Sequence, residues 1–170
     1  PIRCDGCFNR DFWSFTPRVQ VRVDQLAERI FAQKNIDGIT FSGGEPFAQA
    51  RNLARLGELV QDAGLSVITY TGYTYDDILR AERPEWKRLL SVTDLLISGP
   101  YIPSLDCKKT LIGSSNQKII PLTSRITIPT ESMTNSEHIE LIVSRHGNIT
   151  ATGFPGNHFV RRLVHLCNGG

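Results

Sequence analysis

The stretch ITFSGGEPF, residues 39–47, joins a short apolar run to a glycine-rich turn. Residues 39–41 have the β-branched and aromatic composition of a buried strand. Two glycines directly after a strand allow backbone N–H groups to approach a ligand closely, and Glu45 adds a carboxylate beside them. Taken alone, the pattern also fits a plain strand-to-helix turn with Pro46 at the first helical position. The flanking sequence has to decide between these two interpretations.

Apolar strands and amphipathic helices alternate on both sides of this turn. The periodicity predicts helices at 19–36, 47–63, 75–81 and 85–91, and strands at 39–41, 65–72 and 94–101. This alternation is typical of βαβ units and a parallel sheet. Ligand sites in such sheets lie at the carboxyl ends of the strands, which here carry the loops SGGEP, TGYT and SGPY. We expect these three loops and the N-terminal cysteine loop to meet on one rim.

The C-terminal third has weaker patterns. Residues 102–117 are polar and are predicted to form a loop, whereas 118–123 read as a short strand or extended segment. Two β-like runs within 138–154 predict a hairpin, and 157–167 predict a closing helix. Since no repeat or linker interrupts the chain, we expect a single domain over residues 1–170.

The composition excludes some classes of partner. The 19 basic and 17 acidic residues give a net charge of +2, too even a balance for nucleic acid or an anionic membrane as the main partner. No apolar run reaches the length of a membrane span, and the first residues lack the pattern of a signal peptide. We therefore expect a cytoplasmic protein that binds neither nucleic acid nor membrane.

The segment PIRCDGCFN, residues 1–9, places Cys4 and Cys7 two residues apart beside a glycine. Such a pair favours metal or redox chemistry over a structural disulfide. Zinc would require further ligands, but Cys107, Cys167 and the histidines form no second pair at zinc-finger spacing. No nucleophile and base stand at a spacing typical of a hydrolase, so the sequence assigns no catalytic residue. The cysteine pair is therefore predicted to form half of a metal or iron–sulfur site.

The combination of CxxxCxxC with a strand–GGE loop in a βα domain resembles the radical S-adenosylmethionine (SAM) enzymes, in which three thiolates hold a [4Fe–4S] cluster. Here residues 1–3 would separate a first cysteine from Cys4, so we expect a cysteine immediately before Pro1. The chain would then lack its N-terminal strand and first cluster ligand, and would hold a cluster poorly as it stands. A zinc-holding or cluster-less binding module remains the alternative.

Five segments in order narrow the resemblance to the small activating enzymes of anaerobic, class III ribonucleotide reductase, which are glycyl-radical enzyme activases. They are CDGCFNRDFW (4–13), ITFSGGEPF (39–47), TYTGYTYDDIL (69–79), DLLISGPYI (94–102) and GSSNQKII (113–120). The resemblance implies an α/β fold: an incomplete, TIM-type barrel of parallel strands with helices outside. It also implies site residues by position, namely Cys4 and Cys7 for the cluster, Gly43, Gly44 and Glu45 for the methionine end, and Thr71, Gly72 and Tyr73 for the neighbouring cofactor loop.

The activity implied by the resemblance is reductive. A reduced [4Fe–4S] cluster would donate one electron to SAM, giving methionine and a 5′-deoxyadenosyl radical that removes hydrogen from a glycine of a partner enzyme. Implied partners are a glycyl-radical enzyme, such as anaerobic ribonucleotide reductase, and an electron donor such as flavodoxin or ferredoxin.

Some residues depart from the activase pattern. Glu45 and Ser98 stand where the activases often have Asp, and no Arg precedes GSSNQ. A radical SAM enzyme that acts on a small molecule or peptide therefore stays open. The resemblance gives no role to Cys107, Asn116 or Gln117.

Overall fold

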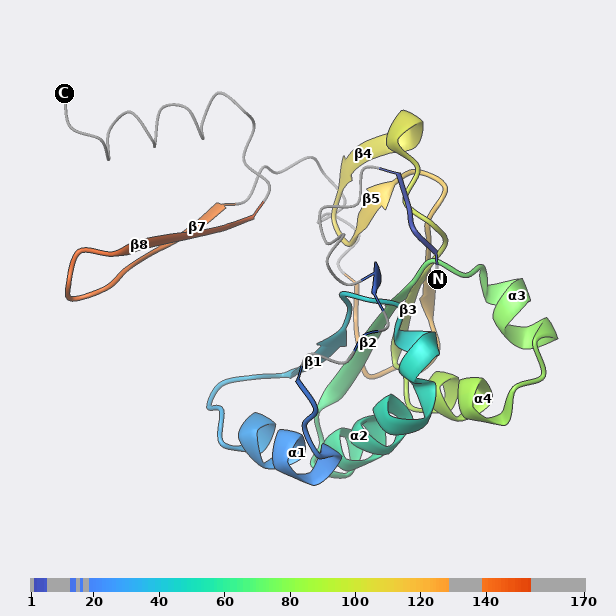
Figure 1. Ribbon diagram of the computed structural model, residues 1–170, viewed down its shortest axis with the longest axis horizontal. Coiled ribbons are helices and arrows are strands. Elements are labelled where there is room, and N and C mark those ends of the chain that lie inside the picture. Colours follow the sequence, from blue (N-terminus) through green and yellow to red (C-terminus); the bar gives the residue numbers. More distant parts are fainter. Residues whose placement is uncertain (1, 6–12, 15, 17–18, 129–138, 154–170) are drawn as a thin grey trace. The chain divides into compact units, whose positions relative to one another are not determined.

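The computed structural model describes residues 2–5, 13–14, 16, 19–128 and 139–153 (Figure 1). The chain divides into two compact units, one of Pro1–Cys107 with Leu111–Thr130 and one of Lys108–Thr110 with Glu131–Gly170. The expectation of one domain over the whole chain stays a prediction.

The first unit is built on a four-stranded sheet of order β1-β2-β3-β6. Its strands are β1 (Gly38–Phe41), β2 (Ser66–Thr71), β3 (Leu95–Ser98) and β6 (Lys118–Pro121). The first three run parallel, as the alternation predicts, whereas β6 runs antiparallel to β3. A mixed α/β fold with a parallel sheet is thus confirmed. The closure of this sheet into a partial barrel stays a prediction.

Helices α1, α2 and α4 gather on one side of this sheet (Figure 1). The helices are α1 (Val23–Phe31), α2 (Ala50–Asp62), α3 (Tyr75–Arg80) and α4 (Pro84–Ser91), and a 3-10 turn η2 (Pro46–Gln49) leads into α2. α1 is shorter than the predicted 19–36. Thr74 caps α3 by accepting from the Asp77 N–H, and Pro84 occupies the first position of α4.

The core lies between the helices and the sheet. Val67 of β2 and Leu96 of β3 belong to one buried cluster with Ala54 and Val60 of α2 and Leu89 of α4, each with 0% exposure. Burial of each large aliphatic side chain contributes roughly 1.5–3 kcal/mol, so this layer holds the strands in register. All four residues of β3 are buried, and β2 alternates buried with half-buried residues.

A buried carboxylate fixes the amino end of β3. Asp94 is fully buried and accepts from the Val67 N–H at 2.8 Å, the Thr123 hydroxyl at 2.6 Å and the Gln61 side-chain amide at 3.2 Å. These donors come from β2, from the segment after β6 and from α2. Asp94 therefore joins three elements at the end of the sheet opposite to the predicted site.

The prediction of a plain loop over 102–117 is wrong. This stretch contains a 3-10 turn η3 (Pro103–Leu105) and a two-stranded sheet of β4 (Asp106–Lys109) and β5 (Ile112–Ser114). The connecting residues Thr110 and Leu111 include no Gly, Asn or Asp, the usual hairpin signals. Leu111 instead adopts φ 71°, a conformation that leucine rarely takes. The residues of this connection therefore do not predict a turn.

In the second unit, β7 (Ile139–Val143) pairs antiparallel with β8 (Ile149–Gly153). Gly147 takes φ 79° in the connection, and the predicted hairpin is confirmed. The predicted helix at 157–167 lies outside the described residues. Within the described part of the chain, no helix has both the length and the apolar character needed to cross a membrane.

Candidate functional site at the carboxyl ends of the strands

The loops that follow β1, β2 and β3 meet on one rim, as predicted. The Thr71 hydroxyl donates to Glu45 Oε1 at 2.8 Å, and the Gly72 N–H donates to Glu45 Oε2 at 3.0 Å. The Gly99 N–H in turn donates to the carbonyl oxygen of Tyr73 at 2.9 Å. SGGEP, TGYT and SGPY are therefore connected to one another by direct hydrogen bonds.

Glu45 is the buried acceptor at the centre of this rim. Its side chain caps η2 by accepting from the Phe47 N–H at 3.0 Å, and the residue is only 8% exposed. Burial raises the pKa of the Glu45 carboxyl, and the hydrogen bonds from Phe47, Gly72 and Thr71 only partly oppose it. The described residues place no cationic side chain within ion-pair distance of this carboxylate. A buried carboxylate of this kind favours a bound cation.

The glycines before Glu45 shape the turn. Gly43 has φ 95°, a conformation that side chains with Cβ rarely adopt, and it is exposed. Gly44 is half-buried and leads directly into Glu45. The sequence places glycine where the backbone requires it, and leaves the backbone of the turn accessible.

Aromatic packing supports the TGYT loop from behind. The Tyr73 ring lies 4.7 Å from that of Trp86, and Trp86 packs edge-on to Phe47 at 5.3 Å. Burial, and then the nearby Glu45 charge, raise the pKa of the Tyr73 hydroxyl, whereas Arg83 opposes them. Phe47 also donates its N–H to Glu45. The stack therefore connects both this donor and the loop that carries Tyr73 to the helix layer.

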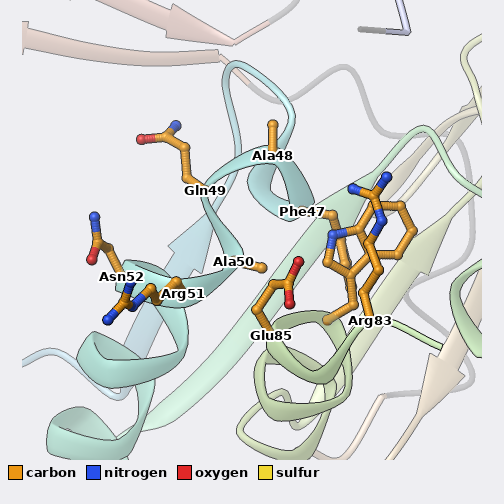
Figure 2. A pocket seen from close by; sticks show the side chains of 9 residues that line it. Phe47, Ala48, Gln49, Ala50, Arg51, Asn52, Arg83 and Glu85 are labelled. Carbon is orange, nitrogen blue, oxygen red and sulfur yellow. The ribbon is translucent and has the colours of Figure 1, made fainter. Parts of the chain in front are cut away.

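Beside this stack lies an open pocket of about 540 Å³ (Figure 2). Its lining consists of Phe47, Ala48, Gln49, Ala50, Arg51, Asn52, Arg83, Glu85 and Trp86. The Arg83 guanidinium carbon lies 4.9 Å from the centroid of the Trp86 ring, which fixes one wall. None of the predicted cofactor residues lines this pocket, so it is separate from the predicted SAM site.

Ile2, in the N-terminal segment that carries the cysteines, lies against the same rim. A Cβ placed on Gly72 would lie 2.6 Å from Ile2 Cγ2, so Ile2 packs directly on the TGYT loop and this glycine cannot be replaced without displacement. Two residues later, Cys4 is a half-buried free thiol, which is a suitable iron ligand. Cys7 lies outside the described residues. Among those described, no three His, Cys, Asp or Glu side chains gather to hold a metal ion.

The GSSNQ segment, which received no role from the sequence, also lies at this rim. Lys118, immediately after it, pairs with Ser98 at the end of β3, and the Asn116 side-chain amide donates to the Pro100 carbonyl at 2.8 Å. Composition offers no signal for this placement, because it depends on the antiparallel register of β6. Cys107 lies on β4 as a half-buried free thiol.

Comparison with known proteins agrees with this arrangement. The model of the family "4Fe-4S single cluster domain" matches residues 1–120. The anaerobic ribonucleoside-triphosphate reductase-activating protein of Enterobacteria phage T4 is 30% identical over 128 residues, covering 69% of this chain and 75% of the relative. The protein of the same name from Haemophilus influenzae is 31% identical over 130 residues, covering 68% and 78%. The pyruvate formate-lyase-activating enzyme of Clostridium pasteurianum is 26% identical over 102 residues, covering 56% and 40%.

The family match contains the cysteine segment and all three rim loops. The two reductase-activating proteins align over more than two thirds of this chain and of their own length. The chain therefore belongs to the 4Fe-4S single cluster domain family, as a radical SAM enzyme of the type that activates glycyl-radical enzymes.

Proposed function

We propose that this protein cleaves SAM reductively and uses the product radical to install a glycyl radical on a partner enzyme such as anaerobic ribonucleotide reductase. The family membership and the names of the relatives support this proposal. The observation that carries it is Glu45, a buried carboxylate without a cationic side-chain partner among the described residues, on the rim against which Ile2 packs.

Cys4 and Cys7 would hold the cluster, together with the cysteine expected before Pro1. When bound, the reduced cluster supplies the single electron that breaks the S–C5′ bond of SAM, which yields methionine and a 5′-deoxyadenosyl radical. That radical would take one hydrogen atom from the partner's glycine and leave as 5′-deoxyadenosine. A flavodoxin or ferredoxin would supply a new electron to the oxidised cluster.

The residues of the rim would bind and orient the methionine end of SAM. Among the described residues, Glu45 Oε2 accepts only the Gly72 N–H, so it can also accept a charge-assisted hydrogen bond from the ligand ammonium. The turn at Gly43 and Gly44, exposed at Gly43, would let a ligand carboxylate approach the backbone. Thr71 and Tyr73 would hold this site in place. The hydroxyl of Thr71 donates a hydrogen bond to Glu45 Oε1, and the Tyr73 ring packs the loop on Trp86.

The test uses the natural full-length protein, reconstituted anaerobically with iron and sulfide and then reduced in the presence of SAM. We expect 5′-deoxyadenosine, and a glycyl radical in the electron paramagnetic resonance spectrum once an anaerobic ribonucleotide reductase is added. Cys4→Ala should abolish both signals, whereas Cys107→Ala, at the other described free thiol, should retain them. A reconstituted protein that carries zinc and never forms 5′-deoxyadenosine would refute the proposal.

A further inference from the structure

Gln117 bridges two backbone segments with its side-chain amide. Its Oε1 accepts from the N–H groups of Gly113, at 2.8 Å, and Ser114, at 3.2 Å. Its Nε2 donates to the Gly99 carbonyl at 3.0 Å. One amide therefore closes the turn before β6 and attaches it to the loop that follows β3.

Asn116 attaches the same loop one residue further on. Its Nδ2 donates to the Pro100 carbonyl, while its Oδ1 is buried without a partner among the described residues. Gly99 has φ 113°, and a Cβ built on it would lie 3.5 Å from Gln117 Cα. Close backbone contact and two amide hydrogen bonds thus hold residues 99–100 against residues 116–117.

The connection continues from Gly99 to Glu45. The Gly99 N–H is shared by the carbonyl oxygens of Thr71, at 3.1 Å, and Tyr73, at 2.9 Å. Thr71 and Gly72 then supply the hydroxyl and N–H that hold the two oxygens of Glu45. An unbroken series of contacts leads from the Gln117 amide to the carboxylate.

We propose that Gln117 and Asn116 are positioning residues for Glu45, acting through Gly99 and the Thr71–Tyr73 loop. The role in SAM binding rests on the proposed function, but the connection itself is a property of the protein without ligand. A carboxylate held by donors at 2.8–3.0 Å loses its hydrogen bonds when the loop that bears them shifts. The alternative is that these amides only stabilise the fold.

Gln117→Glu separates the two possibilities. Near pH 7.5 the new carboxylate is ionised, so it keeps the acceptor for Gly113 and Ser114 but offers no donor to the Gly99 carbonyl. Thr123→Val is the matched control, because it removes a 2.6 Å hydrogen bond to Asp94 at the opposite end of β3. Hydrogen exchange of the Gly72 amide, SAM affinity and the unfolding midpoint are measured on both full-length variants.

We expect Gln117→Glu to speed Gly72 exchange and to weaken SAM binding, each by about tenfold, the equivalent of one hydrogen bond of ordinary strength. Thr123→Val should lower the unfolding midpoint without either change. Unchanged Gly72 exchange in Gln117→Glu, or equal acceleration in Thr123→Val, would overturn the proposal. If the wild-type protein does not bind SAM, the proposed function fails while the exchange result still decides the connection. If Gln117→Glu does not fold, Asn116→Ala, which removes the donor to Pro100, is measured in the same way.

Discussion

Glu45→Gln is the sharpest test of the rim, because it removes a charge without changing the shape of the side chain. The glutamine oxygen can still accept from the Phe47 N–H and the Thr71 hydroxyl, the two donors to Oε1. The new NH₂ group then takes the place of Oε2 and faces the Gly72 N–H, so a donor meets a donor.

Two effects on stability oppose each other. Losing the hydrogen bond from Gly72 to a charged acceptor costs about 1.5–3 kcal/mol. Removing a buried charge recovers the desolvation penalty that raises the pKa of Glu45, so the net loss of unfolding free energy should be smaller than the cost of that hydrogen bond alone. The charge-assisted hydrogen bond to the ligand ammonium has no such compensation. Its loss should weaken SAM binding by about ten- to 150-fold.

Calorimetry on the anaerobically reconstituted protein measures the affinity, and denaturant unfolding of the same sample measures the stability. Glu58→Gln is the control, because it removes the same charge from an exposed carboxylate that pairs with Arg88 on the helix layer. Binding within about twofold of wild type in Glu45→Gln, or an equal loss in Glu58→Gln, would refute the assignment of Glu45 to the SAM ammonium.

Three further outcomes follow from the same contacts. SAM affinity should weaken as pH falls through the raised pKa of Glu45, and again above about pH 8, where an α-amino group loses its proton. In titration calorimetry, the SAM affinity of Glu45→Gln should not show the weakening at low pH. Gly43→Ala and Gly64→Ala should each cost about 1–3 kcal/mol in denaturant unfolding, since both have positive φ and open space around Cβ, but only Gly43→Ala should weaken SAM binding. Asp94→Ala should cost at least about 3 kcal/mol in unfolding free energy, because three donors lose their acceptor.

Local signals in the sequence were sufficient for the elements that carry the rim. The Thr74 hydroxyl caps α3, Pro84 stands at the first position of α4 with a φ suited to a helix, and Gly64 follows α2 with φ 83°. The alternation of strand and helix then fixes the parallel order, and parallel order brings the loops after β1, β2 and β3 to one edge. The proximity of Glu45 to the TGYT loop could therefore be predicted from the order of the strands alone.

The hairpin at 106–114 and the contacts of the GSSNQ segment could not be predicted in this way. The turn of this hairpin includes Leu111 at φ 71°, a conformation that leucine rarely adopts. The amides of Asn116 and Gln117 reach residues 99–100 because β6 returns antiparallel beside β3, pairing Lys118 with Ser98. Such contacts depend on tertiary register, which no local pattern specifies.

The ionisation of Glu45 affects both the stability of the fold and the binding of a ligand. Because its folded-state pKa is raised above the ordinary value near 4.5, the folded state binds the proton more tightly, and the stability from this group falls as pH rises between the two values. Above its raised pKa, Glu45 of the ligand-free protein carries a buried charge at a cost that a ligand ammonium would remove. A ligand that binds only the folded state adds stability by mass action. At a concentration well above its dissociation constant for wild type, SAM should raise the unfolding midpoint of wild type more than that of Glu45→Gln. Equal shifts would mean that the ammonium binds elsewhere on the rim.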